Sequence, residues 1–474
     1  MTGIAAALPE MYLAGAVCVV LLIDVFFGER RRGLTPTLTL LALAIGAALT
    51  LLYANVAGRE VLFHGLYVSD PLAVMLKLLG FLVTAVALLY SHDYLRRRDM
   101  DRGEYYVLVL TALLGVFVIV SANSLLTVYI GVELLALSVY AIVAFDRESA
   151  IAAEAAMKYF VLGAMASGLL LYGMSMVYGL TGTLALDELA QMAAGTPSLG
   201  ITFGLVFLVV AVAFKFGAAP FHMWLPDVYH GAPTAVTTFI SSVPQIAYFA
   251  LLFRLLSYGM NGVADVWQDM LAIVAVLSLV LGNLVAIAQT NMKRMLAYSS
   301  IGNVGFILLG FVAGNVQGQE AALYYTVAYV IMVLGSFGVV LLLSRAGFEA
   351  DELSHFRGLH ARDPLAAAAM GILMFSTAGI PPFLGFWAKF NILQALWLEG
   401  RVTLIIIAAA VSIIGLFYYL RVIKLMYFDA PEGLPVAQGG QGGVRLTLAL
   451  NALAVAALGI MPSALLQWVA RVIG

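Results

Sequence analysis

Apolar stretches of about 20 residues recur along the whole sequence, and each is bounded by a short polar segment. A stretch of that length crosses a ~30 Å hydrocarbon layer as one helix. None shows the ~10-residue alternation of polarity that is typical of a membrane β-barrel. The pattern therefore predicts an all-α polytopic membrane protein with fourteen spans, near residues 6–27, 34–57, 71–91, 105–121, 124–145, 154–179, 200–220, 232–258, 266–287, 294–314, 320–344, 364–397, 402–427 and 446–470.

Prolines interrupt three of these spans. Pro220 lies at the end of the seventh, Pro244 within the eighth, and Pro381 with Pro382 within the twelfth. Proline lacks the backbone donor and clashes with the carbonyl four residues earlier. At membrane depth the freed polar groups need protein or water as partners. We therefore expect broken helices 7, 8 and 12 and a hydrated interior.

Two of the interrupted segments resemble each other, "AAPFHMW" at 218–224 and "IPPFLGFW" at 380–387. They lie five spans apart, and an odd offset inverts the second copy relative to the first. This predicts an inverted repeat of five-helix units, spans 4–8 and 9–13, a pattern typical of membrane ion paths. The expected segments are 1–104 with three helices, 105–258 and 259–428 as the repeats, and 429–474 as a connector and last helix. A Gly-rich connector at 428–445 is expected to be flexible.

Composition and charge agree with this interpretation. With 63% hydrophobic and 11% charged residues, the chain has too few polar groups to cover a water-soluble globule. Of the Arg and Lys residues at the ends of the predicted spans and between them, sixteen fall on one side of the membrane and four on the other, which places both termini on the outer side. We expect the first helix to be retained rather than cleaved. The single cysteine, Cys18, excludes a disulfide within the chain and a four-thiolate iron–sulfur site.

Ionisable residues inside spans are the main functional signal, since each costs at least ~2.5 kcal/mol at the bilayer centre. Glu133 lies too deep in the fifth span to reach either surface. Lys215 and Lys158, on spans 7 and 6, are its candidate partners, and a lysine–carboxylate pair whose members influence each other's protonation suits a proton carrier. A static ion pair that only fixes helix packing is the alternative. Lys389 lies beside the third interruption.

Two further cations lie within predicted spans and have an ordinary explanation. Lys77 and Arg254 are near helix ends, where long side chains can reach the interface by snorkelling.

Two histidines accompany the first interruption. His222 and His230 fall on the inner side, where they could relay protons or simply be solvated, and Asp227 could cap or pair there. The sequence contains no glycine-rich nucleotide-binding motif and no convincing pair of mid-membrane histidines for haem. The energy for proton movement would then come from another gradient or another subunit.

Four motifs resemble the N subunit of bacterial NADH:quinone oxidoreductase, respiratory complex I, an antiporter-like membrane subunit. They are "EAAMKYFVLGA" (154–164), "FKFGAAPFHMWLPDVYHGAPT" (214–234), "MKRMLAYSSIGNVGF" (292–306) and "GIPPFLGFWAKF" (379–390). The second and fourth are shared with sibling subunits and with multi-subunit sodium/proton antiporters. The resemblance covers essentially the whole chain.

The resemblance implies two proton half-channels joined by a central polar axis. By this resemblance, the charge of Glu133 adjusts the protonation of Lys215, Lys158 extends the charged axis, and Lys389 faces the outer half-channel. It implies that the chain holds no cofactor, that FMN, iron–sulfur clusters and quinone belong to partner subunits, and that homologous antiporter-like subunits are neighbours in a bacterial inner membrane. No nucleic acid partner is expected.

One position departs from the family pattern. Where the family commonly has a lysine on the eighth helix, this chain has Gln245 in "VPQIAYF". Glutamine cannot titrate, although it can order water. Water with Gln245 could form the central link, His230 could take part of the role, or this copy could conduct poorly.

Three functions remain open on the sequence. The first is a proton-translocating subunit of a redox-driven pump, and the second is a subunit of a secondary cation/proton antiporter. The third is a structural or coupling subunit that conducts nothing.

Overall fold

The computed structural model describes the chain except for residues 1, 28–32, 54–57, 193–197, 432–441 and 474. Within the described residues, 13 helices are long and apolar enough to cross a membrane. Two shorter helices, α16 (Pro364–Ala378) and α17 (Leu384–Leu398), together occupy the place of the twelfth predicted span. The prediction of an all-α membrane protein is confirmed.

The N-terminal part contains three of the spanning helices and a short antiparallel hairpin that the sequence pattern did not predict. Its elements are α1 (Thr2–Ala6), α2 (Leu8–Phe27), α3 (Leu34–Leu52), β1 (Glu60–Leu62), β2 (Tyr67–Ser69) and α4 (Pro71–Arg97). Asp70 begins α4 by accepting a hydrogen bond from the backbone of Ala73, the usual role of an N-cap carboxylate.

The first expected five-helix unit follows. Its elements are α5 (Gly103–Val120), α6 (Leu125–Val143), α7 (Ala150–Thr181), the short α8 (Leu186–Met192), α9 (Leu199–Phe216), α10 (Trp224–Gly231) and α11 (Thr234–Leu252), which continues as a π-helical turn (Phe253–Tyr258). Residues 217–223 separate α9 from α10 and are called the first break.

The second expected unit and the C-terminal helices complete the chain. A 3₁₀ turn (Asn261–Val263) leads into α12 (Ala264–Ala288), α13 (Met292–Val312) and α14 (Val316–Leu343). A second 3₁₀ turn (Leu353–Phe356) and α15 (Leu359–Arg362) precede α16 and α17, followed by α18 (Val402–Tyr427), α19 (Gly442–Ile460) and α20 (Pro462–Ile473). Residues 379–383, between α16 and α17, are called the second break.

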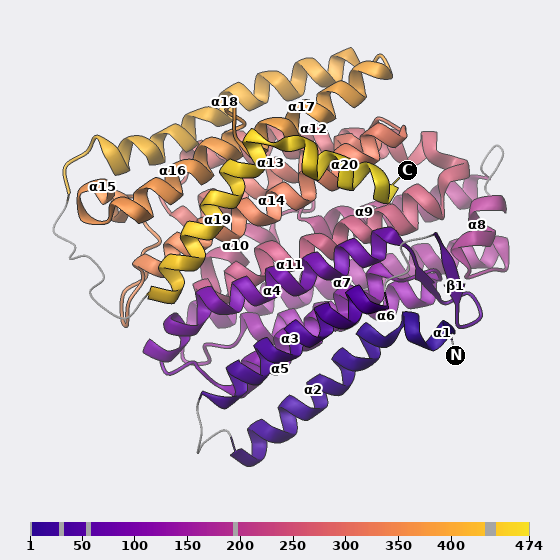
Figure 1. Cartoon of the computed structure of the whole chain (residues 1–474). Coiled ribbons are helices and arrows are strands. Elements are labelled where there is room, and N and C mark those ends of the chain that lie inside the picture. The colour runs from indigo at the N-terminus through magenta and orange to yellow at the C-terminus, as the bar shows by residue number, and fades with distance from the viewer. Residues whose placement is uncertain (1, 28–32, 54–57, 193–197, 432–441, 474) are drawn as a thin grey trace.

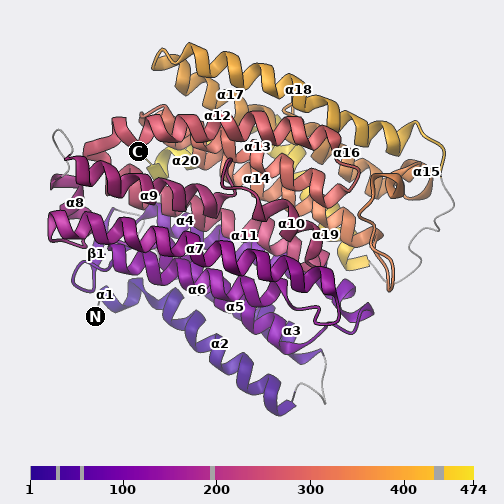
Figure 2. The same ribbon diagram turned by 180° about the vertical axis from the view of Figure 1, so that it is seen from behind.

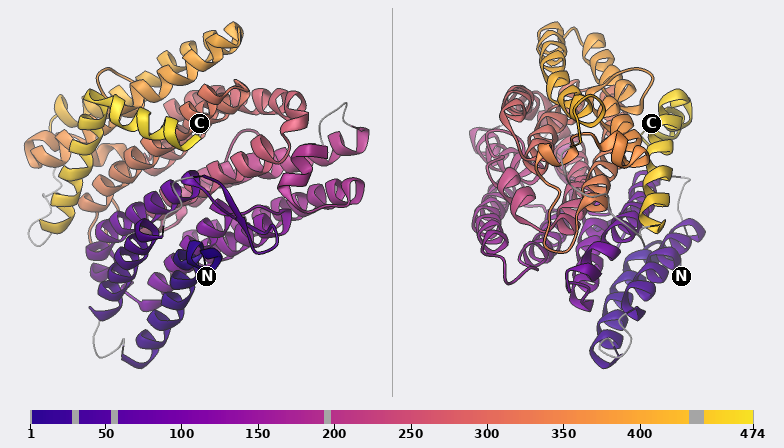
Figure 3. Two further views of the ribbon diagram at one scale, coloured as in Figure 1. Left: turned by 45° about the vertical axis from the view of Figure 1, so that its right-hand side comes forward. Right: turned by 90° about the vertical axis from the view of Figure 1, so that its left-hand side faces the viewer.

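The helices form one bundle with a distinct centre and two edges. In Figure 1, α2 and α18 lie at opposite edges, while α11 and α14 run through the middle, and the reverse view in Figure 2 agrees. Helices α11, α13 and α14 are almost completely buried, whereas few residues of α2 and α18 are buried. Figure 3 shows α19 and α20, in yellow, on the outside of the bundle.

The two expected units pack alike. Helix α5 packs on α6 as α12 packs on α13, and α7 packs on α9 as α14 packs on the halves α16 and α17. The exact boundaries of the four segments stay a prediction, and most of the expected flexible connector lies outside the described residues.

The structure differs from the expected helices at two prolines, Pro244 and Pro462. Pro244 does not interrupt the eighth span, because α11 runs through it and the irregularity comes later, in the π-helical turn at Phe253–Tyr258. One missing donor is tolerated where neighbouring helices enclose the backbone. The last span also ends earlier than expected, since Pro462 starts the separate helix α20.

Candidate functional site

The first break ends α9 in a tight left-handed turn. Gly217 has φ +70°, and the amides of Gly217 and Ala218 donate back to the carbonyls of Phe214 (2.9 Å) and Ala213 (2.8 Å). Glycine takes this conformation without the strain that a side chain would cause. Trp224, at the start of α10, donates from Nε1 to Phe214 O at 2.9 Å, so the carbonyls of Ala213 and Phe214 both have partners.

The second break repeats this backbone pattern. Gly379 has φ +88°, and the amides of Gly379 and Ile380 donate to the carbonyls of Ser376 (2.9 Å) and Phe375 (3.0 Å). Lys389 on α17 returns across the break and donates from Nζ to Ala378 O at 2.9 Å. A carbonyl released by the helix end is thus the partner of the lysine.

Lys215 lies in the last turn of α9 and is buried, with 4% of its surface exposed. Its Nζ donates to Ser167 Oγ on α7 at 3.2 Å. Glu133 on α6 is close enough for its charge to act on Lys215. The two side chains nevertheless form no ion pair, and Glu133 Oε1 is buried without a hydrogen-bond partner among the described residues. An acceptor in that position is available to a proton or a water molecule.

A set of buried polar side chains continues from this pair towards the second break. The rings of Tyr140 on α6 and Tyr159 on α7 pack edge to face, with centroids 4.7 Å apart. Tyr248 on α11 is buried and packs on Phe216 of α9, with centroids 5.8 Å apart. On α10, the Tyr229 ring packs edge-on against Phe337 of α14, with centroids 6.0 Å apart. On α11, Gln245 Oε1 is buried without a hydrogen-bond partner among the described residues.

The set then follows α13 and α14. Tyr329 donates to Ser300 Oγ at 2.6 Å, and one turn away Tyr325 donates to Asn303 Oδ1 at 2.7 Å. Phe306 stacks on Tyr325, with their ring centroids 5.7 Å apart. Lys389 Nζ lies 5.4 Å from the Phe306 ring centroid.

We call this set the central row. It consists of Glu133, Lys215, Ser167, Tyr140, Tyr159, Tyr248, Tyr229, Gln245, Ser300, Tyr329, Asn303, Tyr325 and Lys389. Most of its members were not predicted, because a tyrosine in an apolar span is indistinguishable from a packing residue without its neighbours. A signal was present in "AYSSIGN" at 297–303 and "YYTVAY" at 324–329, where polar residues recur at helical spacing inside deep spans.

Lys158 does not lie in the central row. Its side chain is 45% exposed and its Nζ pairs with Glu154 at 2.9 Å and Asp227 at 2.8 Å. Arg294 binds the other oxygen of Asp227 at 2.9 Å. Burial by itself would raise the pKa of Asp227, but Lys158 and Arg294 outweigh it and lower the pKa below its ordinary value. Asp227 therefore acts as a fixed negative charge between two cations.

The two histidines lie at different depths around the first break. His222 is half-buried in the break, with its ring centroid 6.3 Å from that of Tyr298. His230, at the end of α10, has Nε2 4.0 Å from Asp351 Oδ2. Burial, reinforced by the charge of Lys293, lowers the pKa of His230, so its imidazole is neutral at neutral pH.

The residues that the structure describes include no group of three or more His, Cys, Asp or Glu placed to hold a metal ion. The site brings together buried lysines, a carboxylate and hydroxyls, groups that donate and accept hydrogen bonds.

Comparison with known proteins identifies the family. A family model described as NADH:quinone oxidoreductase/Mrp antiporter, transmembrane, matches residues 122–415. The NADH-quinone oxidoreductase subunit N of Thiobacillus denitrificans is 52% identical over 99% of this chain and 97% of its own length. The chain belongs to the subunit N family. The subunit N of Methylovorus glucosotrophus is 51% identical over 98% of this chain and 96% of its own length.

Solved structures agree with the subunit N family. A chain of respiratory complex I from Thermus thermophilus, solved with bound aureothin, superposes with a TM-score of 0.83 at 31% identity, covering 97% of this chain and 98% of that chain. A chain of the Mrp complex from Dietzia gives a TM-score of 0.87 at 20% identity, covering 99% and 97%. The second likeness concerns the fold alone.

Proposed function

We propose that the chain is a cofactor-free, proton-translocating membrane subunit of a redox-driven NADH:quinone oxidoreductase. Membership of the subunit N family supports the assembly. The observation that carries the proton role is the central row, because buried ionisable groups that face protein inside a membrane are expensive and mark ion pathways.

In this proposal Lys215 and Glu133 form the inner proton-loading pair, and Lys389 releases protons at the second break. A proton that reaches Lys215 can move on through tyrosine and serine hydroxyls, each of which accepts one proton as it releases another, while Asn303 can only orient its neighbours. Gln245 takes part by orienting its neighbours and not by titrating. Lys158 stays outside the central row, where it pairs with Asp227.

The energy source would lie in partner subunits. We expect FMN, iron–sulfur clusters and quinone there, homologous antiporter-like subunits as neighbours, and a bacterial inner membrane with both termini on the outer side. The broken helices alone would also suit a secondary cation/proton antiporter. Family membership favours the redox-driven assembly over that alternative.

The test replaces the two members of the inner pair. Glu133→Gln and Lys215→Met keep the side-chain size but remove the titrating group. Each should lower proton pumping by inverted membrane vesicles by about tenfold or more, because a positioned proton-transfer group contributes on the order of 10²-fold in rate. A pH-sensitive dye reports pumping while NADH oxidation is followed by absorbance.

Lys424→Met is the matched control, since that lysine is 71% exposed on α18. It should pump like the parent protein. Normal pumping per NADH in both Glu133→Gln and Lys215→Met would reject the proton role and leave a structural or coupling subunit.

A further inference from the structure

A cavity of about 1000 Å³ lies at the end of the bundle where α2 and α4 finish and α3 and α5 begin. Its size is at the upper end of the usual range of ligand sites, about 300–1000 Å³. The residues that line it come from those helix ends and from the loop between α4 and α5, and none of them belongs to the central row. Because the ends of spanning helices lie at the membrane surface, the cavity is at the depth of lipid head groups.

One side of the cavity is apolar and faces outwards. Leu21 and Val25 lie about one helical turn apart on α2, and they are 43% and 70% exposed. Helix α2 packs mainly on α3 and α5, so the rest of its surface is left to the surroundings of the bundle. Leu21 is the farther of the two from the end of α2. An apolar strip therefore leads from the cavity along α2 towards the hydrocarbon.

One wall of the cavity holds a carboxylate in a fixed position. Asp24 Oδ1 accepts a hydrogen bond from Thr35 Oγ1 at 2.7 Å. A Cβ at Gly103, the first residue of α5, would overlap the Asp24 carboxylate, so glycine is needed to leave room for it. The unpaired backbone amides of a helix N-terminus favour an anion at that place. Asp24 is thus a fixed negative charge between α2, α3 and α5.

A second carboxylate of the lining is held by a buried hydroxyl. Tyr106, 2% exposed, donates to Asp101 Oδ1 at 2.7 Å, and His92 Nδ1 lies 3.4 Å from the same hydroxyl. Asp99 and Glu104 also line the cavity, and both are exposed. The cavity therefore presents four carboxylates, two of which are held in place by hydrogen bonds.

Two arginines of the lining have no anionic partner. Arg96 and Arg102 are exposed, and no carboxylate among the described residues forms an ion pair with either of them. The neighbouring Arg98 differs, since its guanidinium lies 2.5 Å from Glu349 and donates to two backbone carbonyls. Two guanidinium groups around one cavity suit a phosphate, which arginine binds through two parallel hydrogen bonds.

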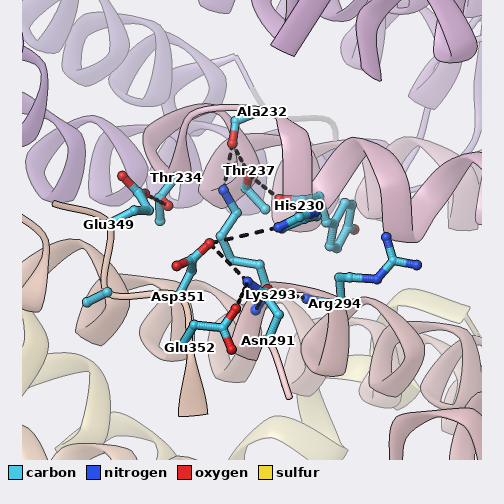
Figure 4. Close-up of polar contacts among 12 residues, drawn as sticks. His230, Ala232, Thr234, Thr237, Asn291, Lys293, Arg294, Glu349, Asp351 and Glu352 are labelled. Carbon is cyan, nitrogen blue, oxygen red and sulfur yellow. Dashed lines mark hydrogen bonds and ion pairs between the residues drawn. The ribbon is translucent and has the colours of Figure 1, made fainter. Parts of the chain in front are cut away.

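The cluster that contains Glu349 and Lys293 lies at the same end of the bundle and is organised differently (Figure 4). Lys293 Nζ donates to Ala232 O at 2.7 Å, and Asn291 Nδ2 donates to Asp351 Oδ2 at 2.9 Å. The polar groups of that cluster thus find partners within the chain. The cavity instead presents charges of both signs to open space, where a ligand can reach them.

We propose that this cavity binds one phospholipid with an ethanolamine head group. The phosphate lies between Arg96 and Arg102, the ammonium donates its hydrogens to the surrounding carboxylates, and the acyl chains follow Leu21 and Val25 along α2. Four lining acids against two lining arginines disfavour an anionic head group that lacks the amine. A choline head group has no N–H to donate. The inference is independent of the proton role of the central row.

The test labels the site with a photoactivatable phosphatidylethanolamine. The assembled complex is reconstituted in phosphatidylcholine vesicles that contain the probe as a minor component, and labelled peptides are located by mass spectrometry. The peptide that carries Leu21 and Val25 should be labelled. Unlabelled phosphatidylethanolamine should suppress this labelling at severalfold lower amounts than phosphatidylglycerol does. Glycerophosphoethanolamine, which has the same head group without acyl chains, should not compete.

Variants remove the groups that bind the phosphate. Arg96→Gln combined with Arg102→Gln should lower labelling severalfold while the complex still assembles, because both side chains are exposed. Arg147→Gln is the matched control, since Arg147 is also exposed, in the loop between α6 and α7, and does not line the cavity. It should be labelled like the parent protein.

Each of the other outcomes overturns the inference. Absent labelling on the unaltered protein, or unchanged labelling in the double variant, would show that no lipid is held by the two arginines. Equal suppression by phosphatidylglycerol would remove the role of the acids. Suppression by glycerophosphoethanolamine would identify a soluble ligand, and an equal loss in Arg147→Gln would reduce the effect to overall charge.

Discussion

Asp70 and Arg254 form an ion pair that is buried within the protein, instead of the interface contact that the sequence suggested for Arg254. The guanidinium binds both carboxylate oxygens, at 2.6 and 2.7 Å, and Arg254 Nε donates to Val120 O at 3.1 Å. Burial alone would raise the pKa of Asp70, but Arg254 lowers it below its ordinary value. Lys77 is likewise internal, paired with Glu10 at 2.6 Å. The snorkelling interpretation was wrong for both, because the partners are distant in sequence.

Removing Arg254 should therefore leave a buried, unpaired carboxylate. Arg254→Met is expected to destabilise the protein by about 3–5 kcal/mol, the usual consequence of breaking a buried pair from one side. Arg254→Lys keeps the charge but not the two-pronged contact, and should lose less. The midpoint of thermal unfolding of the purified complex measures both. An unchanged midpoint in Arg254→Met would contradict the assigned role of the pair.

At the scale of elements, the two breaks are the features that the sequence predicts best. Proline and glycine act through local backbone chemistry, so "FGAAPF" and "AGIPPF" specify the same turn wherever they occur. Pro244 shows the limit of that reasoning. Its effect depends on the helices that enclose α11, which no local pattern contains.

The absence of a side chain at Gly379 leaves room for Lys389 in its present position. A Cβ at Gly379 would lie 2.9 Å from Lys389 Cδ, whereas at Gly182, which ends α7 with φ +73°, a Cβ would meet nothing within 4 Å. Gly379→Ala and Gly182→Ala should each cost about 1–2 kcal/mol, because both force a side chain into the left-handed region. Only Gly379→Ala should also displace Lys389 and lower pumping.

Thermal unfolding and vesicle pumping, measured on both glycine variants, test this expectation. Equal pumping in the two variants would mean that Lys389 accommodates the methyl group or does not need its present position.

The whole molecule shows why the central row was only partly predictable. Glu133, Lys215 and Lys389 are conspicuous because charge is rare at membrane depth, and the structure places them near one another or near a break. Tyr229, Tyr329 and Asn303 acquire meaning only when helices from both five-helix units meet. Lys158 is the opposite case. It is charged and lies within a predicted span, but its side chain is exposed on the outside of the isolated chain.

The exposed apolar surface of the bundle indicates contacts with lipid or with other subunits. Helices α2 and α18 expose large apolar side chains, among them Val25, Phe26 and Ile413, which suit lipid or neighbouring subunits. Purification from native membranes in mild detergent should yield a large assembly with other antiporter-like subunits and with flavin and iron–sulfur subunits, detected by mass spectrometry. Recovery of the chain alone, or with antiporter partners only, would favour the antiporter alternative.

Helix α19 packs against the second break. Gly459 of α19 accepts a hydrogen bond from Trp387 Nε1 at 2.9 Å, and a Cβ there would lie 2.5 Å from Pro382 O. Helix α19, which follows the second break in the sequence, thus packs directly against it. Because chains are synthesised from the N-terminus, α16 and α17 are made before α19, and the second break lacks this contact until α19 has been added.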